Sequence, residues 1–211
     1  GSNRVYLGFD DWGFVFSYWF IVDSLQAEKY THEWEQNLSK DLIKFYPFEY
    51  LNLFNLDNFC PVNCYPTGHP ENRSNFNDPL LKDELAQYPA FSNVPDHIFL
   101  GHTVTYMMLQ IAVIMGCNPI YLIGVDHRYK INMRDRLKGL WQNVASANHF
   151  HKDYGSAAKG ARQFHLPQAK QSELFFDFAA TWAEKNGVQV LNATPNTALP
   201  SFKLVNYDEL F

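Results

Sequence analysis

The fold class is decided by one segment, Thr103-Val-Thr-Tyr-Met-Met-Leu-Gln-Ile-Ala-Val-Ile-Met-Gly-Cys-Asn-Pro-Ile-Tyr-Leu-Ile-Gly-Val-Asp126. Thr103 is a good helix N-cap, residues 104–115 are apolar nearly all round, and Gly116 suits the position that follows a helix. A second apolar run then ends at Asp126, as a buried strand does. The segment therefore predicts a helix followed by a strand, which is half of an α/β unit.

A second unit of this kind lies near the C-terminus. Residues 168–186 predict a helix closed by Gly187, and residues 188–191 predict a strand that ends at Asn192. Two such units favour an α/β, Rossmann-like fold with a mostly parallel sheet and helices on both faces. We expect a single nucleotide-binding domain over residues 1–211.

The N-terminal part has a comparable pattern. Residues 15–22 form a continuous apolar run that stops at Asp23, which predicts a strand buried on both faces. Residues 24–45 are amphipathic and predict a helix. Residues 55–96 are rich in Asn, Pro and aromatic residues, so we expect irregular chain there with one short helix near 79–87.

A polar segment, 127–165, separates the two helix-to-strand units. It contains four of the eight histidines: His127, His149, His151 and His165. This composition is typical either of a flap or lid over an active site or of a solvated loop and helix.

Composition excludes several classes of protein. With 46% apolar residues the chain is not disordered, and a formal charge of -5 gives no general attraction for nucleic acid or anionic lipid. The sequence lacks the run of about 18 apolar residues that a transmembrane helix needs. Three cysteines are too few for a disulfide framework, which favours a reducing compartment, with the cytoplasm as the expected location.

Polar residues at the predicted strand ends are the first candidates for a ligand site, because ligands of open parallel sheets bind outside the carboxyl ends of the strands. Asp23, Asp126 and residues 192–194 fall there. Asp126 could accept a hydrogen bond from a ribose hydroxyl, hold a metal, or simply cap the next turn. Residues 101–105 open the apolar helix, whose free N–H groups could hold an anion, with plain capping as the alternative.

The sequence Asn148-His-Phe-His-Lys-Asp-Tyr154 places two imidazoles, a cation, an acid and a phenol close together. A histidine can take a proton from a hydroxyl, while Lys, Arg and Tyr can stabilise a departing phosphate. A solvated polar loop is the alternative. His149 and His151 lack a nearby third zinc ligand, and the sequence has no Asp-x-Asp motif, so no metal site is predicted.

Several segments together carry a resemblance to a known family. They are Asn3-Arg-Val-Tyr-Leu7, the run that ends at Asp23, the segment 103–126, the segment 148–154, and Val190-Leu-Asn-Ala-Thr-Pro-Asn-Thr-Ala-Leu-Pro-Ser-Phe202. In their order and spacing they resemble, over nearly all the chain, the 6-hydroxymethylpterin diphosphokinase-like family. That family includes motility-associated flagellin glycosyltransferases and is similar in pattern to bacterial sialyltransferases that use CMP-sialic acid.

The resemblance implies a Rossmann-like domain with a lid over the donor. It implies nucleotide contacts from Asn3, Asp23, Thr103, Thr105, Gly124 and Asp126. The sialyltransferases carry Asn where this chain has Asp23. The catalytic histidine of the family lies in a flap, which leaves His149, His151 and, third, His165 as candidates, and Arg128 and Tyr129 lie where the family meets the donor phosphate. The family's first strand and Gly-x-Gly-Pro-Ser loop, which would precede Asn3, are missing from this sequence.

We therefore expect a metal-independent glycosyltransferase without a cofactor, which moves a sialic-acid-like or related sugar from a CMP-type nucleotide-sugar donor to a hydroxyl of a glycan or protein acceptor. His149 or His151 would take the acceptor proton, while Tyr129, Arg128 and the helix terminus at Thr103 stabilise the leaving phosphate. Two alternatives stay open. One is a 6-hydroxymethylpterin pyrophosphokinase that uses ATP and Mg²⁺, with Asp23 and Asp126 as the metal-bearing acids, and the other is a non-catalytic nucleotide-binding module. No nucleic-acid partner or membrane span is expected, and a homo-oligomer is compatible with the sequence.

Overall fold

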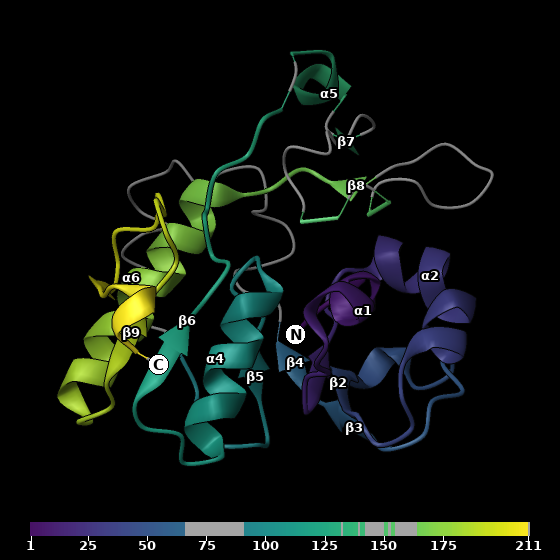
Figure 1. The fold of residues 1–211 in the computed structure, drawn as a ribbon, viewed down its shortest axis with the longest axis horizontal. Helices are drawn as coiled ribbons and strands as arrows, with labels where there is room; N and C mark the ends of the chain where they lie inside the picture. Colours follow the sequence, from purple (N-terminus) through teal and green to yellow (C-terminus); the bar gives the residue numbers. More distant parts are fainter. Residues whose placement is uncertain are drawn as a thin grey trace. The chain divides into compact units, whose positions relative to one another are not determined.

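A computed structural model of the chain describes residues 1–65, 91–131, 133–138, 140–141, 150–151, 153–154 and 164–210. The described residues form helices and mostly parallel strands, so the fold class is α/β (Figure 1). The chain divides into two compact units. Unit 1 consists of Gly1–Val62 and Tyr129–Pro167, and unit 2 of Asn63–Arg128 and Gln168–Phe211. The expectation of one Rossmann-like domain over 1–211 stays a prediction.

Unit 1 contains a parallel sheet with the order β1-β2-β3. Its strands are β1 (Tyr18–Phe20), β2 (Ile43–Pro47) and β3 (Phe59–Val62), and helix α2 (Ser24–Asn37) connects the first two (Figure 1). Ser2 forms a parallel bridge with Phe20, and two short helices, η1 (Val5–Gly8) and α1 (Phe9–Trp12), follow it. The core of the unit includes Trp19 of β1 and Trp34 of α2, whose rings meet edge to face at 5.0 Å.

Two expectations for unit 1 were wrong in their bounds. The strand expected over 15–22 begins only at Tyr18, and Val15 before it is 53% exposed. The helix expected over 24–45 ends at Asn37, and Ile43–Pro47 is strand β2. Lys44 explains the change of direction, because its buried Nζ donates to three carbonyl groups and so fixes the turn before β2. The three acceptors are the carbonyl oxygens of Ser39, Leu42 and Asp57. Burial lowers the pKa of Lys44.

Unit 2 contains both helix-to-strand units expected from the sequence. The first is α4 (Val104–Ile114) with β6 (Ile120–Leu122), and the second is α6 (Ala169–Lys185) with β9 (Val190–Asn192). Strand β10 (Lys203–Leu204) completes a parallel sheet of order β10-β9-β6, while β4 (Cys64–Tyr65) pairs with β5 (Ile98–Phe99) and η5 (Tyr207–Glu209) closes the described chain. Thr103 caps α4, and Gly116 and Gly187 take the left-handed conformation that the sequence predicts after each helix. Strand β3 of unit 1 and the two-residue strands β4 and β5 were missed. Strands β3 and β4 lie in the stretch 55–96, for which irregular chain was expected, and such short runs carry no periodicity.

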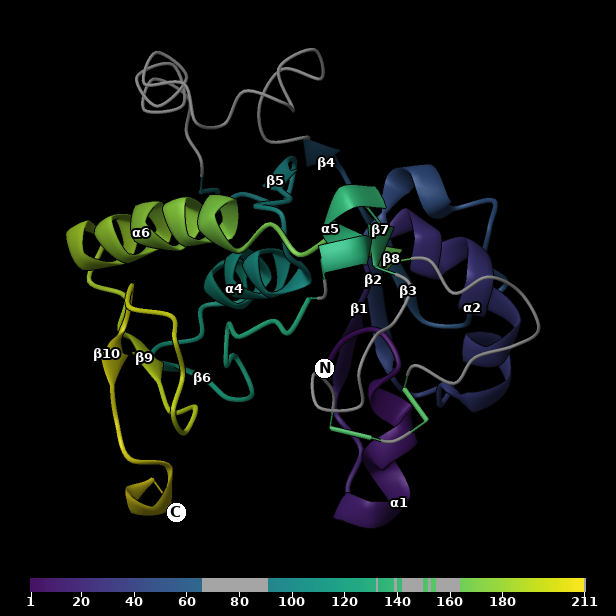
Figure 2. The ribbon, with the colours of Figure 1, turned by 90° about the horizontal axis from the view of Figure 1, so that it is seen from above.

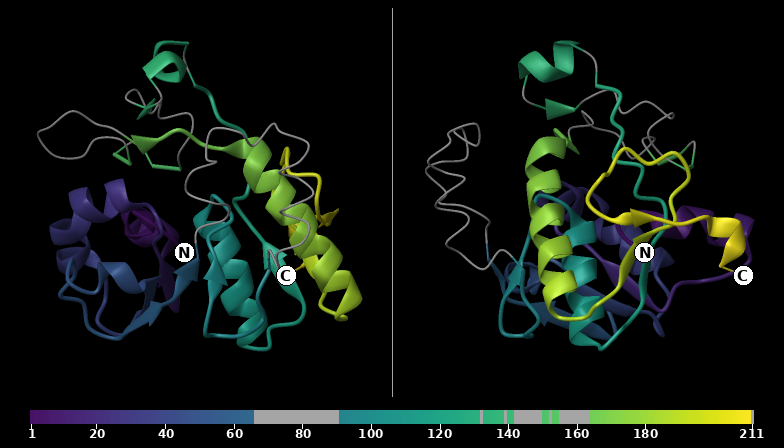
Figure 3. Two further views of the ribbon diagram at one scale, coloured as in Figure 1. Left: turned by 180° about the vertical axis from the view of Figure 1, so that it is seen from behind. Right: turned by 90° about the vertical axis from the view of Figure 1, so that its left-hand side faces the viewer.

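One face of this sheet carries the core of unit 2. Helices α4 and α6 lie side by side (Figure 3) and pack on the same side of β6 and β9 (Figure 2). Tyr106 of α4 and Phe176 of α6 share this core with Leu122 of β6. Tyr121 and Ile123 are 41% and 54% exposed, so the described helices leave their side of β6 open.

The expected flap is described only in part. Helix α5 (Met133–Lys138) and the antiparallel pair β7 (Leu140–Trp141) and β8 (Phe164–His165) belong to unit 1. His149 and the helix expected near 79–87 lie outside the described residues. In the described ranges, no helix combines the length and the hydrophobicity that a membrane span requires.

Candidate functional site

Asp23 and His165 come together at the carboxyl end of β1. Oδ1 of Asp23 accepts hydrogen bonds from the backbone N–H groups of Leu25 at 2.9 Å and Gln26 at 3.2 Å, so the residue caps α2. The same oxygen lies 3.7 Å from Nε2 of His165. Asp23 therefore both holds the start of a helix and faces an imidazole from β8.

This pairing orients the imidazole of His165. A carboxylate next to Nε2 favours the tautomer with its proton on that nitrogen, which leaves Nδ1 as the basic atom. Nδ1 has no hydrogen-bond partner among the described residues, and the side chain is 58% exposed. The imidazole is thus oriented on one side and accessible to a substrate hydroxyl on the other.

His151 is arranged differently. Its Nδ1 accepts a hydrogen bond from the backbone N–H of Asp153 at 3.2 Å, and its side chain is only 19% exposed. A neutral imidazole has a single acceptor nitrogen, and here the local turn occupies it. Of the two candidate histidines that the structure describes, His151 and His165, the second is the better placed to act as a general base. The sequence had ranked it third.

A buried arginine holds the segment around His151 in place. The guanidinium of Arg4 donates to the carbonyl oxygens of Asp153 (2.8 Å) and Tyr154, and to Glu33 of α2, and it lies 4.7 Å from the ring centroid of Tyr30. Tyr6 donates its hydroxyl to the same Glu33 oxygen. Arg4 therefore ties the N-terminal segment, helix α2 and the 153–154 turn together.

The ionisation of this cluster follows from its burial and contacts. Burial alone lowers the pKa of Arg4, but the hydrogen bonds to Glu33 and Tyr6 outweigh it, so the pKa is raised. Burial and the hydrogen bond to Glu33 raise the pKa of Tyr6. Burial raises the pKa of Tyr154 to about 12. Arg4 is thus charged and both phenols are neutral at physiological pH.

Two buried carboxamides in the same unit retain an unpaired acceptor. Asn3 has a left-handed backbone, its N–H donates to the carbonyl of Phe20, and its side chain bonds Tyr154, yet its Oδ1 is buried without a partner. Gln26 donates Nε2 to Oδ2 of Asp23 at 3.3 Å and leaves Oε1 buried and unpaired. Unpaired buried acceptors are rare in folded proteins, so both oxygens are candidates to receive donors from a ligand. No sequence pattern singled out Gln26.

In unit 2, Asp126 follows β6 in a loop fixed by two threonines. Thr194 accepts the N–H of Val125 at 3.0 Å, and Thr197 donates to the carbonyl of Val125 at 2.6 Å. Gly124 has a φ of +74°, which allows the chain to turn outward. The carboxylate of Asp126 is exposed and makes no hydrogen bond within the described part of the chain. Asp126 is therefore not the cap of a turn, which was the structural alternative for this residue.

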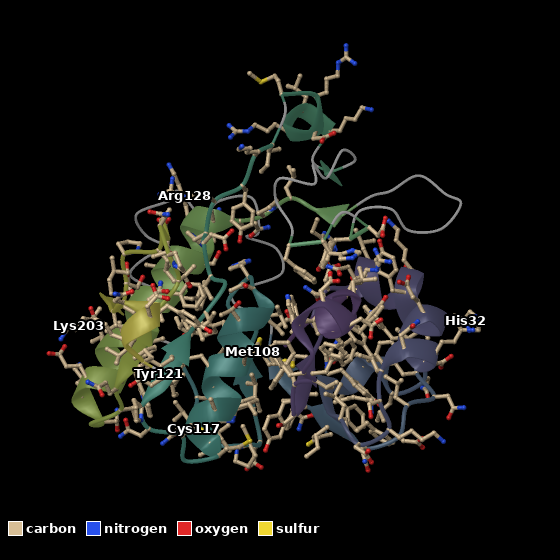
Figure 4. All side chains as sticks on the ribbon, viewed as in Figure 1. His32, Met108, Cys117, Tyr121, Arg128 and Lys203 are labelled. Carbon is tan, nitrogen blue, oxygen red and sulfur yellow. The ribbon has the colours of Figure 1, made fainter. Side chains whose placement is uncertain are left out.

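The next residue, His127, is held by helix α6. Its Nε2 lies 3.1 Å from the carbonyl of Ala169 and 3.2 Å from Oε1 of Glu173, and its side chain is 3% exposed. Arg128 donates Nε to the carbonyl of Asn196 at 3.0 Å and projects near the start of α6 (Figure 4). The sequence did not single out Glu173, which lies among the polar residues of an amphipathic helix.

The remaining predicted residues are distributed over both units. Tyr129, which is 41% exposed, belongs to unit 1 with Asn3, Asp23 and the described histidines 151 and 165. Unit 2 holds Thr103, Thr105, Gly124, Asp126 and Arg128. Oγ1 of Thr103 accepts the N–H of Thr105 at 3.4 Å, which is the plain capping arrangement. Across the described ranges, His, Cys, Asp and Glu side chains form no group of three or more that could hold a metal ion.

No protein-family model matches the chain, and no curated protein or solved structure shows significant similarity to it. The resemblance to the diphosphokinase-like family therefore stays a prediction from the motifs quoted above.

Proposed function

We propose that the chain is a metal-independent glycosyltransferase in which His165 is the general base. The observation that carries this proposal is the 3.7 Å approach of Asp23 Oδ1 to His165 Nε2, with Nδ1 directed to no described residue. A carboxylate and an imidazole in this relation form the acid–base part of many transfer sites.

In the proposed reaction, Nδ1 of His165 takes the proton of the acceptor hydroxyl as its oxygen attacks the anomeric carbon of the donor sugar. The bond from that carbon to the phosphate oxygen breaks, and its electron pair leaves on the nucleotide. Asp23 stabilises the imidazolium that forms. Arg128, Tyr129 and the α4 terminus at Thr103 stay the proposed phosphate contacts, on the basis of the family resemblance.

We assign the donor as a CMP-type nucleotide sugar carrying a sialic-acid-like or related sugar. Cytosine has an exocyclic amino group and ribose has hydroxyls, which are the kinds of donors that unpaired carbonyl oxygens accept. Oδ1 of Asn3 and Oε1 of Gln26 in unit 1 are acceptors of this kind, and since both are buried a side-chain movement must expose them to the ligand. Asp126 stays a predicted contact to a ribose hydroxyl on the basis of the family resemblance.

The second candidate is a pyrophosphokinase that uses ATP and Mg²⁺. The exposed carboxylate of Asp126 favours it to some extent, because a carboxylate oxygen is the ligand type that Mg²⁺ prefers. Asp23 fits this role less well, since its oxygens already accept two backbone N–H groups and the Gln26 amide.

Thermal-shift measurements with CMP, CDP, ATP and ATP with Mg²⁺ separate these functions, because a ligand that binds only the folded state raises the melting temperature. We expect stabilisation by CMP and CDP, and sugar transfer from CMP-sialic acid that continues in EDTA. Stabilisation by ATP with Mg²⁺ alone would support the pyrophosphokinase. Binding of CMP with neither transfer nor donor hydrolysis would support the non-catalytic module.

A further inference from the structure

Unit 1 exposes a cluster of aromatic rings that the proposed reaction does not use. We define the aromatic patch as Trp12, Phe14, Phe16 and Phe150. Three of these rings are open to solvent: Trp12 is 38% exposed, Phe14 54% and Phe150 53%. A small group of large exposed rings in mutual contact is typical of a binding surface.

The patch is rigid. Phe16 is partly buried against the core of unit 1 and contacts Phe14 at 5.3 Å and Trp12 at 6.0 Å between ring centroids. The indole of Trp12 lies so close over Gly8 that a Cβ on that glycine would be 2.5 Å from Cζ2. A surface whose rings are fixed before binding loses little conformational entropy when a ligand arrives.

The geometry of the rings suits flat ligands. Trp12 and Phe14 are nearly parallel, with 24° between their planes and 5.9 Å between centroids, and Gly13 between them has the left-handed φ of +67° that the turn requires. Phe150 adds a third ring, 5.0 Å from Trp12. The C–H faces of pyranose rings stack on such aromatic planes.

The charges beside the patch narrow the choice of ligand. Asp10 and Asp11 are exposed on α1, directly before Trp12, and form no ion pair or hydrogen bond with the described residues. Carboxylates accept hydrogen bonds from sugar hydroxyls, whereas they repel anionic lipids, phosphates and acidic sugars. Membrane-binding surfaces pair their aromatic residues with Lys and Arg, and the segment 9–16 contains neither.

We propose that the aromatic patch binds a neutral oligosaccharide, and that this is the acceptor of the transfer reaction. The assignment as acceptor rests on the proposed function, while the binding of a neutral saccharide stands without it. Phe150 directly precedes His151 and its ring contacts Tyr154 at 5.8 Å, so the patch continues into the segment that Arg4 anchors.

The test is a titration of the chain with lactose, N-acetyllactosamine and maltotriose, followed by tryptophan fluorescence and by calorimetry. We expect saturable binding of at least one of these saccharides, weakened roughly tenfold in Trp12→Ala and in Phe150→Ala, since each variant removes one stacking surface. Phe48→Ala, which removes a ring that is 55% exposed elsewhere in unit 1, is the matched control and should bind as the wild type does. Gly8→Ala displaces the indole without removing it and should also weaken binding.

Three outcomes overturn the proposal. The first is that none of the saccharides binds, and the second is that Trp12→Ala binds them as tightly as the wild type does. The third is that the patch variants keep saccharide binding and lose only vesicle binding, measured with phosphatidylcholine, or self-association of the chain. Stabilisation by CMP is measured on the same variants and separates the two proposals. Saccharide binding without CMP binding or transfer would contradict the proposed function and leave the patch assignment in place. Transfer that Trp12→Ala leaves unchanged would contradict the acceptor assignment alone.

Discussion

Nη1 of Arg4 donates a hydrogen bond of 2.8 Å to the carbonyl oxygen of Asp153, 149 positions further along the chain. The same guanidinium is paired with Glu33 of α2, and the side chain of Arg4 is only 5% exposed. One buried cation therefore joins the N-terminal segment, a helix and a turn from the far part of unit 1. Such an arrangement is sensitive to the loss of either charge.

Replacing Arg4 by Met should lower the free energy of unfolding by about 3 kcal/mol, because Glu33 loses its cationic partner and two carbonyl groups lose their donor. Urea denaturation followed by tryptophan fluorescence measures this, since Trp19 and Trp34 report on the core of unit 1. Arg4→Lys keeps the charge, but a single ammonium group does not match the planar guanidinium fork that reaches Glu33 and both carbonyl groups. Its free energy of unfolding should therefore lie between those of the wild type and Arg4→Met. A loss below about 1 kcal/mol in Arg4→Met would contradict the anchoring role.

The catalytic proposal makes its sharpest prediction at Asp23, whose two roles can be separated. Asn is as good an N-cap as Asp, so Asp23→Asn should keep the stability of α2 and lose the charge that orients His165. We expect Tm to stay nearly unchanged while kcat falls about 100-fold, as it should in His165→Ala. Asp23→Ala should in addition lose about 1 kcal/mol of stability with the cap.

The controls are the other histidines of the expected flap. His149→Ala and His151→Ala should keep most of the activity, with CMP binding intact in every variant. Full activity of His165→Ala together with an inactive His151→Ala would return the role of base to His151, as the sequence first indicated. If none of the three variants loses activity, the transferase mechanism is wrong.

The sequence predicted best the elements that local chemistry determines. Thr103, Gly116 and Gly187 mark helix ends through capping and left-handed backbone, and the structure confirms α4 and α6 close to the expected bounds. The sequence prediction missed strand β2, because residues 24–45 are amphipathic throughout. The hydrogen bonds that turn the chain before β2 come from Lys44, and one of them reaches Asp57, which lies beyond the range of helical periodicity. Periodicity over 24–45 contains no signal for such a contact.

Only part of the candidate site was predictable from the sequence. Strand ends pointed to Asp23 and Asp126, since their position follows from the parallel sheet rule. The partner of Asp23 did not follow, because β8 brings His165 to it from the other end of unit 1 and no spacing encodes that approach. The unpaired oxygen of Gln26 is likewise a property of packing, which a single sequence does not display.

Replacement of Asp126 should affect ligand binding, whereas replacement of Thr197 should affect stability. Since the carboxylate of Asp126 is exposed and bonds no described residue, Asp126→Ala should leave the free energy of unfolding unchanged and weaken CMP binding. Thr197→Val should lose about 1 kcal/mol, because its hydroxyl bonds Val125 and accepts the N–H of Leu199 at 3.1 Å. Chemical denaturation and CMP titration of both variants measure the two effects. A destabilised Asp126→Ala with normal CMP affinity would restore the capping role.

The pH dependence of the free energy of unfolding should reveal the raised pKa of Tyr154. Burial raises the pKa of its phenol to about 12 from the ordinary value of 10.0, so between these values the unfolded chain releases the proton while the folded chain keeps it. The contribution to stability is therefore complete below pH 10 and is lost as the pH rises toward 12, by about 3 kcal/mol at most. Tyr6 and Tyr106, whose pKa values are also raised, add to this loss, whereas Lys44, whose pKa is lowered, opposes it.

Comparison of variants isolates the part that belongs to Tyr154. Urea denaturation at pH 8, 9, 10 and 11 measures the free energy of unfolding of the wild type and of Tyr154→Phe. The difference between the two values should shrink by about 1.4 kcal/mol for each pH unit above 10, because the Phe variant has no phenol to ionise. Tyr121→Phe, which removes a phenol that is 41% exposed, is the matched control variant. A constant difference between the wild type and Tyr154→Phe across this range would mean that Tyr154 titrates like an exposed tyrosine, and would refute its burial between Arg4 and Asn3.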